Sequence, residues 1–193
     1  MIERMDVLRA LARHRTDEVV VMTMTTTLQW PLVSDSDLDF DFLAFGMGHA
    51  SDFGLGLALA RPERRVIVLK GDGGLLMSLG SLVTIARHGP ENLIVLLMEN
   101  RSYEITGGQP LPERVDFVKL GVACGVEGGG ATGRGTVRRI ASLSEFEAAV
   151  GGLLTAAGPH FVVLPVTNSQ PLPAVSHTDH AGRVARLRRA LAL

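Results

Sequence analysis

Runs of consecutive apolar residues along this chain predict the strands of a sheet. The clearest are EVVVMTM, VIVL and LIVLLM, together with the run that ends at Val166. Strands of a parallel sheet are covered on both faces, so they are apolar throughout instead of alternating with polar positions. We predict strands over residues 18–24, 40–45, 66–69, 93–98, 136–140 and 161–166.

Segments with apolar residues at helical spacing lie between these strands. We predict helices over residues 3–14, 51–60, 75–87, 115–124, 143–157 and 181–193. Residues 25–37, which contain Pro31, and residues 101–114 are expected to be loops. Alternating strands and helices predict an α/β fold in three layers, with a mainly parallel sheet in the middle. Because no repeat or shift in composition divides the chain, residues 1–193 are expected to form one domain.

Two glycines fall inside the predicted helix of residues 51–60. Gly54 and Gly56 each destabilise a helix by about 1 kcal/mol relative to alanine. Their presence in one helix indicates that its backbone packs closely against a neighbouring element.

Composition and charge narrow the classes of function. The formal net charge is -1 and 20% of the residues are charged, so nothing indicates the basic face that nucleic-acid binding needs. No apolar run reaches about 18 residues, so we expect no membrane-spanning helix and no membrane partner. The N-terminal residues are charged and lack the apolar stretch of a signal peptide. Cys124, the single cysteine, cannot form an internal disulfide, which favours the cytoplasm.

Three unusual turns follow three different predicted strands. They are Gly46-Met47-Gly48-His49, Gly71-Asp72-Gly73-Gly74 and Asn100-Arg101-Ser102-Tyr103. Ligands of open parallel sheets bind beyond the carboxyl ends of the strands, and right-handed crossovers return each strand to the same edge. We therefore expect Asp72 and Asn100 to lie side by side, although a helix and a strand separate them in the sequence.

An aspartate and an asparagine at one sheet edge suit a hard cation such as Mg²⁺, which prefers oxygen ligands and often shares them with phosphates. Glycines at 71, 73 and 74 allow a phosphate to approach the backbone, and the following helix start offers free N–H groups. The alternative is that Gly-Asp-Gly is only a tight turn with a helix cap. A dinucleotide fingerprint is excluded, because the sixth position counted from Gly46 is Ser51 and not glycine.

The motif Gly71-Asp72-Gly73, followed at this distance by Asn100, resembles the signature of thiamine-diphosphate enzymes. The stretches FGMGHASDFGLGLALARPERRVIVLKGDG and GDGGLLMSLGSLVTIARHGPENLIVLLMENRSYEITGGQP are similar to the diphosphate-binding (β) subunit of sulfopyruvate decarboxylase and to phosphonopyruvate decarboxylase. This resemblance covers residues 40–112 and implies the diphosphate-type thiamine-binding fold.

The resemblance implies specific ligands for thiamine diphosphate and Mg²⁺. The Mg²⁺ ligands would be Asp72, Asn100 and the carbonyl of Ser102. Met47 would support the bent cofactor, or it is a core residue. His49 would donate to a phosphate oxygen, or it is structural; residues 106–109 would pass over the thiazolium ring. The implied cofactor contacts are Gly46, Met47, Gly48, His49, Gly71, Asp72, Gly73, Gly74, Asn100, Ser102 and Tyr103.

The implied reaction is the non-oxidative decarboxylation of a 2-oxo acid. In the family the cofactor site is shared between two domains, and the activating glutamate comes from the pyrimidine-binding one. This chain carries only the diphosphate-type motifs, so we expect that glutamate on a separate α-type subunit of a hetero-oligomer and assign no catalytic residue here. The candidate contact surfaces are the segment from Met22 to Trp30 and the glycine-bearing helix after Gly48. The alternatives are a subunit of a carboligase or of a 2-oxo-acid oxidoreductase, or a non-catalytic scaffold subunit.

Three residues depart from the family pattern. Lys70 stands where an apolar residue is usual, and Arg101 and Glu104 stand where the family often has small residues. Glu104 would lie near the substrate and repel a sulfonate or phosphonate, or it forms an exposed loop pair with Arg101. The identity of the 2-oxo acid therefore stays open.

Overall fold

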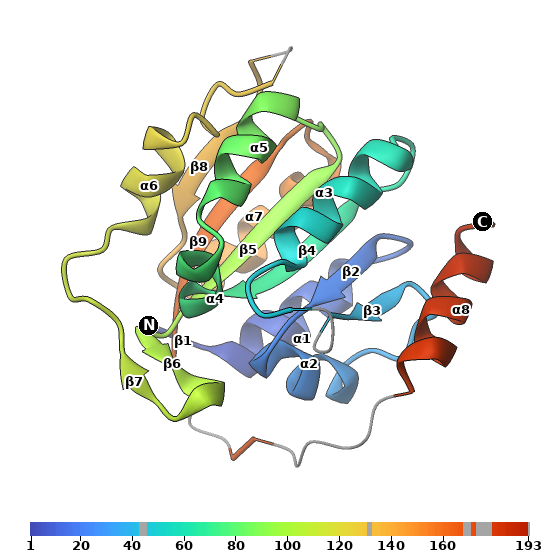
Figure 1. The fold of residues 1–193 in the computed structure, drawn as a ribbon, viewed down its shortest axis with the longest axis horizontal. Helices are drawn as coiled ribbons and strands as arrows, with labels where there is room; N and C mark the ends of the chain where they lie inside the picture. The colour runs from blue at the N-terminus through green and yellow to red at the C-terminus, as the bar shows by residue number, and fades with distance from the viewer. Residues whose placement is uncertain (43–45, 131–132, 168–170, 173–178, 193) are drawn as a thin grey trace.

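The computed structural model describes residues 1–42, 46–130, 133–167, 171–172 and 179–192. Among these residues, a seven-stranded sheet runs in the order β1-β9-β5-β4-β2-β3, with β8 also paired to β9 (Figure 1). Every pairing in this sheet is parallel. Its strands are β1 (Ile2–Glu3), β2 (Val19–Met22), β3 (Asp39–Asp41), β4 (Val66–Gly71), β5 (Leu93–Glu99), β8 (Thr136–Arg139) and β9 (His160–Thr167). The predicted parallel α/β sheet is confirmed.

Helices cover both faces of the sheet and give the predicted three layers (Figure 1). Alternate residues of β2, β4, β5 and β9 enter two separate hydrophobic clusters: in β4, Val66 and Val68 face one, and Ile67 and Leu69 face the other. This is why the strands are apolar without alternation. The first cluster contains residues of α3 (Ala50–Ala60), α5 (Gly80–His88), α6 (Phe117–Ala123) and α8 (His180–Ala190), and the second contains residues of α1 (Arg4–His14) and α7 (Leu143–Thr155).

The loop predicted for residues 25–37 is wrong for residues 25–32 and correct for residues 33–37. This segment begins with α2 (Thr25–Gln29) and continues in the 3₁₀ helix η1 (Trp30–Leu32). Pro31 lies in the first turn of η1, where a backbone N–H has no partner within the helix, so the proline does not interrupt it. Met22 and Trp30 are both completely buried. The ends of the segment from Met22 to Trp30 therefore belong to the core of this chain and not to a contact surface.

The region predicted as one helix over residues 75–87 is mostly helical, but two helices occupy it. They are α4 (Asp72–Met77) and α5, and Ser78 between them has a non-helical backbone. The Ser78 hydroxyl accepts a hydrogen bond from Lys70 at 3.0 Å and donates to the carbonyl of Gly48. Because these partners come from other elements, the apolar spacing around Ser78 does not reveal the break.

Residues 101–114, predicted as a loop, contain three short elements. They are β6 (Ser102–Tyr103), the 3₁₀ helix η3 (Glu104–Thr106) and β7 (Gln109–Pro110), and β6 pairs with β7 in a separate antiparallel sheet. The strand predicted for residues 40–45 is found as β3, and residues 43–45 lie outside the described part of the chain. Strand β1 was not predicted.

The two glycines of α3 differ in their surroundings. A Cβ atom on Gly54 would lie 2.3 Å from Cγ2 of Val68 on β4, so the predicted close packing is confirmed for Gly54. A Cβ on Gly56 would meet no atom within 4 Å, so the prediction is wrong for Gly56. No helix within the described residues is both long and apolar enough to cross a membrane.

Candidate cofactor and metal site

A cavity of about 390 Å³ opens at the carboxyl edge of the sheet, where β2, β4 and β5 end side by side. Its volume is in the range of small-molecule sites. The segments that follow these three strands form most of its wall. The lining residues are Arg4, Thr23, Met24, Thr25, Thr26, Met47, Gly71, Asp72, Gly73, Gly74, Met77, Met98, Asn100, Ser102, Tyr103, Glu104, Ile105 and Thr106.

Asp72 is the first residue of α4 and its side chain is almost completely buried. One carboxylate oxygen accepts a hydrogen bond from the backbone N–H of Gly73 at 2.9 Å, and the other accepts from that of Arg101 at 2.7 Å. The pKa of Asp72 is raised to about 6, mainly by burial and to a smaller extent by nearby Glu99, and these two hydrogen bonds limit the rise. A bound cation would offset this cost, because it favours the charged form.

Asn100 follows β5 and lies beside the segment that follows β4. In the sheet Gly71 pairs with Met98, which brings the next residues of the two strands to the same edge. The side-chain oxygen of Asn100 accepts a hydrogen bond from the backbone of Ser102 at 3.0 Å. Asp72, Asn100 and Ser102 all line the cavity, so the three predicted Mg²⁺ ligands are brought together. This oxygen-rich donor set fits a hard cation.

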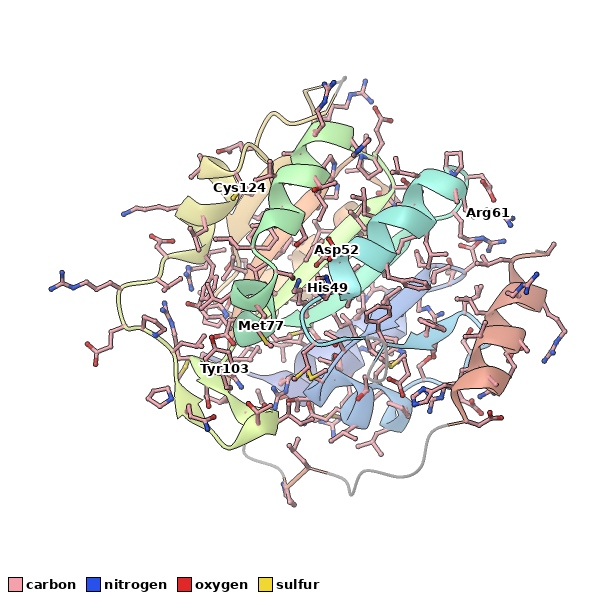
Figure 2. The ribbon with its side chains drawn as sticks, in the orientation of Figure 1. His49, Asp52, Arg61, Met77, Tyr103 and Cys124 are labelled. Carbon is pink, nitrogen blue, oxygen red and sulfur yellow. The ribbon has the colours of Figure 1, made fainter. Side chains whose placement is uncertain are left out.

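The glycines after β4 leave the backbone open to a ligand. A Cβ atom on Gly71 would meet nothing within 4 Å, so a side chain there would occupy the cavity. A Cβ on Gly73 would lie 2.7 Å from the ring of Tyr103. Tyr103 from β6 and Met77 from α4, both labelled in Figure 2, line the cavity. The local structure therefore requires glycine at Gly73, whereas glycine at Gly71 leaves open space at the cavity.

The turn before α3 lies only partly at the cavity. Met47 lines the cavity and is 45% exposed, so it is not a core methionine. Gly46, Gly48 and His49 are not among the described residues that line it. Nδ1 of His49 lies 2.7 Å from Oδ2 of Asp52 one turn along α3, as Figure 2 illustrates. The structure thus gives His49 a surface partner.

Lys70, which stands where the family usually has an apolar residue, is completely buried below this turn. Its ammonium group donates to the carbonyl of Gly48 at 2.6 Å and to the hydroxyls of Ser51 and Ser78 at 3.1 Å and 3.0 Å. Burial lowers the pKa of Lys70 to about 8. Lys70 therefore links the Met47 turn to α3 and to the end of α4.

Arg101 and Glu104 do not form an exposed pair, so that alternative is wrong. Arg101 bonds Glu99 at 2.5 Å and the carbonyl of Val115 at 2.7 Å. Glu104 lines the cavity and forms two hydrogen bonds with buried Arg4, at 2.8 Å and 2.9 Å. Glu104 does lie at the cavity, as the interpretation that placed it near the substrate expected. Its negative charge is balanced by Arg4.

Two groups of cavity residues that lie far in sequence from the predicted motifs were not predicted. Thr23, Met24, Thr25 and Thr26 follow β2, and Met24 adopts a positive φ of 52° that is costly for a residue with a side chain. The Thr23 hydroxyl is buried and has no hydrogen-bond partner among the described residues. The end of the predicted strand EVVVMTM could have indicated the first group, but the sequence does not show that this strand lies beside β4. Arg4 gave no signal.

The sequence profile described as "Thiamine pyrophosphate enzyme, C-terminal TPP binding domain" matches residues 22–164, which include all three strand ends at the cavity. This chain belongs to the thiamine pyrophosphate enzymes. Thiamine pyrophosphate is another name for thiamine diphosphate, so the expected cofactor family is confirmed. The matched region is the TPP binding domain of this family.

Relatives of this thiamine pyrophosphate enzyme domain include two proteins named sulfopyruvate decarboxylase subunit beta. The one from Methanococcus maripaludis is 31% identical over 171 residues, covering 88% of this chain and 92% of the relative. The one from Methanothermobacter thermautotrophicus is 44% identical over 117 residues, covering 61% of this chain and 56% of the relative. A phosphonopyruvate decarboxylase from Streptomyces hygroscopicus is 40% identical over 118 residues, which cover 61% of this chain and 27% of the relative.

The chain thus spans between about a quarter and nearly all of the length of these relatives. Among solved structures, benzoylformate decarboxylase from Polynucleobacter necessarius matches with a TM-score of 0.70 and 22% identity. The match covers 90% of this chain and 34% of that structure. This likeness establishes the shared fold.

Proposed function

We propose that this chain is the thiamine-diphosphate- and Mg²⁺-binding subunit of a two-subunit 2-oxo-acid decarboxylase that acts on a sulfopyruvate- or phosphonopyruvate-like substrate. The observation that carries the proposal is the buried Asp72 beside Asn100 in a glycine-lined cavity. The relatives named sulfopyruvate decarboxylase subunit beta and phosphonopyruvate decarboxylase support the choice of reaction.

Each group of cavity residues has a distinct task in this proposal. Asp72, Asn100 and the Ser102 carbonyl hold Mg²⁺, and the backbone of Gly71, Gly73 and Gly74 leaves room for the diphosphate. Met47 supports the ring system from the cavity wall. When bound, thiamine diphosphate accepts the electron pair that a 2-oxo acid leaves as it releases carbon dioxide. Apolar lining residues such as Met77 and Ile105 exclude water from this region.

The pyrimidine-binding side of the site and the activating glutamate come from a partner chain of the α type. Support comes from the matched profile, which describes only the C-terminal TPP binding domain, and from relatives that are named as one subunit. The described residues form one main sheet, which supports treating the chain as a single diphosphate-type domain. We propose the cytoplasm as its compartment, because the single Cys124 has no second cysteine for an internal disulfide.

The decisive experiment compares the chain alone with the chain co-purified with its partner. Both preparations receive thiamine diphosphate, Mg²⁺ and a panel of 2-oxo acids that includes sulfopyruvate and phosphonopyruvate, and carbon dioxide release is measured. We expect decarboxylation only by the two-chain preparation. Robust turnover by the single chain would refute the shared site, and no turnover of any 2-oxo acid by the assembled enzyme would refute the reaction.

A matched pair of variants tests the cofactor site itself. Asp72→Ala should abolish the Mg²⁺-dependent rise in melting temperature that thiamine diphosphate produces. Asp17→Ala removes an exposed carboxylate that pairs with Arg64 and does not line the cavity, and it should leave that rise unchanged. Tight Mg²⁺-dependent binding by Asp72→Ala would contradict the metal assignment.

A further inference from the structure

Glu104 gathers hydrogen bonds from three separate parts of the chain. Its carboxylate accepts from both terminal nitrogens of Arg4, which begins α1, at 2.8 Å and 2.9 Å. It accepts from the hydroxyl of Thr25 at the start of α2 at 3.0 Å. It also accepts from Nδ2 of Asn100 at 3.0 Å. One carboxylate thus connects the N-terminal helix, the segment after β2 and the segment after β5.

The bond to Glu104 decides which way the Asn100 amide faces. An ionised carboxylate only accepts hydrogen bonds, so the group of Asn100 that faces it must be the NH₂. The amide oxygen then lies on the other side, where it accepts from the backbone of Ser102 at 3.0 Å. A carbonyl oxygen has two lone pairs, so one is left for a cation at the cavity. A reversed amide would present two N–H donors to the cation instead.

Arg4 keeps Glu104 in this role. The Arg4 side chain is 2% exposed and that of Glu104 is 21% exposed, so both charges are held largely away from water. A buried guanidinium without its carboxylate is strongly unfavourable. Because two parallel bonds join Arg4 to Glu104, the carboxylate has a fixed orientation toward Asn100.

We propose that Glu104 is a positioning residue for the metal site: it fixes the Asn100 amide so that its oxygen faces the cation, and Arg4 holds Glu104 in place. This inference rests on the proposed function, in which Asn100 is a Mg²⁺ ligand. Under this inference Glu104, which departs from the family pattern, contributes to the affinity for the cation. Outer partners of metal ligands change affinity by roughly 10–100-fold when they are replaced.

The test replaces Glu104 by an uncharged residue of the same shape. In Glu104→Gln, an NH₂ group replaces one of two acceptors: either Oε2, which faces Arg4, Thr25 and Asn100, or Oε1, which faces Arg4 alone. The first rotamer loses the bond from Asn100, and the second loses the bidentate pair that orients the side chain toward Asn100. Asp39→Asn is the matched control, because Asp39 also pairs with a buried arginine, Arg15, at 2.8 Å and is not among the cavity residues. Both variants lose a carboxylate from a largely buried ion pair, so both are expected to lower the melting temperature of the unliganded chain.

Two readouts separate positioning from general stability. The first is the affinity for thiamine diphosphate at fixed Mg²⁺, measured with the chain alone and with its partner. We expect Glu104→Gln to weaken it about tenfold or more, and Asp39→Asn to change it less than about twofold. The second is hydrogen exchange of the Asn100 side-chain NH₂ by nuclear magnetic resonance, with the signal assigned by its loss in Asn100→Asp. Exchange should be slow in the unmodified chain and fast in Glu104→Gln.

The outcomes distinguish this inference from the proposed function. If the unmodified protein binds thiamine diphosphate with Mg²⁺ and Glu104→Gln binds it equally well, the positioning role of Glu104 is overturned and the proposed function stands. Equal exchange rates of the Asn100 amide in both proteins would also overturn it. If the unmodified protein shows no Mg²⁺-dependent binding of thiamine diphosphate with or without its partner, both the proposed function and this inference are refuted.

Discussion

Asp72→Asn isolates the free-energy cost of a charged carboxylate at the cofactor cavity. Burial raises the pKa of Asp72 from 3.8 to about 6 in the folded chain without cofactor. The folded state therefore holds this proton more tightly than the unfolded state. The resulting stability is fully present below pH 4 or so and is lost as the pH rises through about 6. A difference of about two pKa units corresponds to roughly 3 kcal/mol at neutral pH.

The magnitude can be measured as a melting temperature. For a domain of this size about 1 kcal/mol shifts the melting temperature by about 2–4 °C, so roughly 3 kcal/mol corresponds to about 6–12 °C. Asparagine at position 72 carries no charge at any pH. The melting temperature of Asp72→Asn minus that of the unmodified chain should therefore rise by about 6–12 °C between about pH 4 and pH 7.5.

The change of this melting-temperature difference with pH is more informative than its value at any one pH. The Asp72 carboxylate accepts from two backbone N–H groups, and an asparagine oxygen can replace only one of these bonds at its own site. That loss costs about 1–3 kcal/mol at every pH. Asp17→Asn, at an exposed position, is the control and should show a flat difference. A flat difference for Asp72→Asn as well would refute the inference that the cavity holds an energetically costly charge.

Three further predictions concern the wall of the cavity and its support. Met47→Ala should lower turnover of the assembled enzyme far more than it weakens thiamine diphosphate affinity; unchanged turnover would leave Met47 as a surface residue only. Lys70→Met leaves the Gly48 carbonyl and its neighbours without their buried donor and should lower the free energy of unfolding in urea by about 2–4 kcal/mol. Gly54→Ala should destabilise the chain by about 1–3 kcal/mol through overpacking against β4, whereas Gly56→Ala should stabilise it by up to about 1 kcal/mol in the same assay.

The sequence predicted the sheet well because its buried strands are continuously apolar. It placed Asp72 and Asn100 at one edge, because parallel strands joined by a helical crossover end at the same edge of the sheet. It missed α2 and the break at Ser78, because both depend on tertiary contacts and not on local spacing. Helix propensity and apolar periodicity depend only on the residues of the helix itself. The break at Ser78 involves Lys70 on β4 and the carbonyl of Gly48 before α3.

The partners of the site were harder to predict than its ligands. Arg4 reaches Glu104 across a hundred positions of sequence, and nothing near either residue indicates the other. Thr25 and Thr26 reach the cavity because β2 lies beside β4, and strand order is set by the fold as a whole. A single sequence reveals residues whose chemistry is unusual for their position, but it does not reveal which distant residue neutralises a charge.

The pairing of β1 with β9 has a consequence for how the chain folds. Ile2 and Glu3 pair with Val166 and Thr167, and α1 packs against α7. During synthesis residues 2–14 are made long before their partners, residues 143–167. Contacts between such distant segments form slowly, because a large loop must close before they contribute. The apolar side of α1 is therefore left uncovered in the nascent chain, and the wall of the cavity that Arg4 provides is completed only after β9 has been translated.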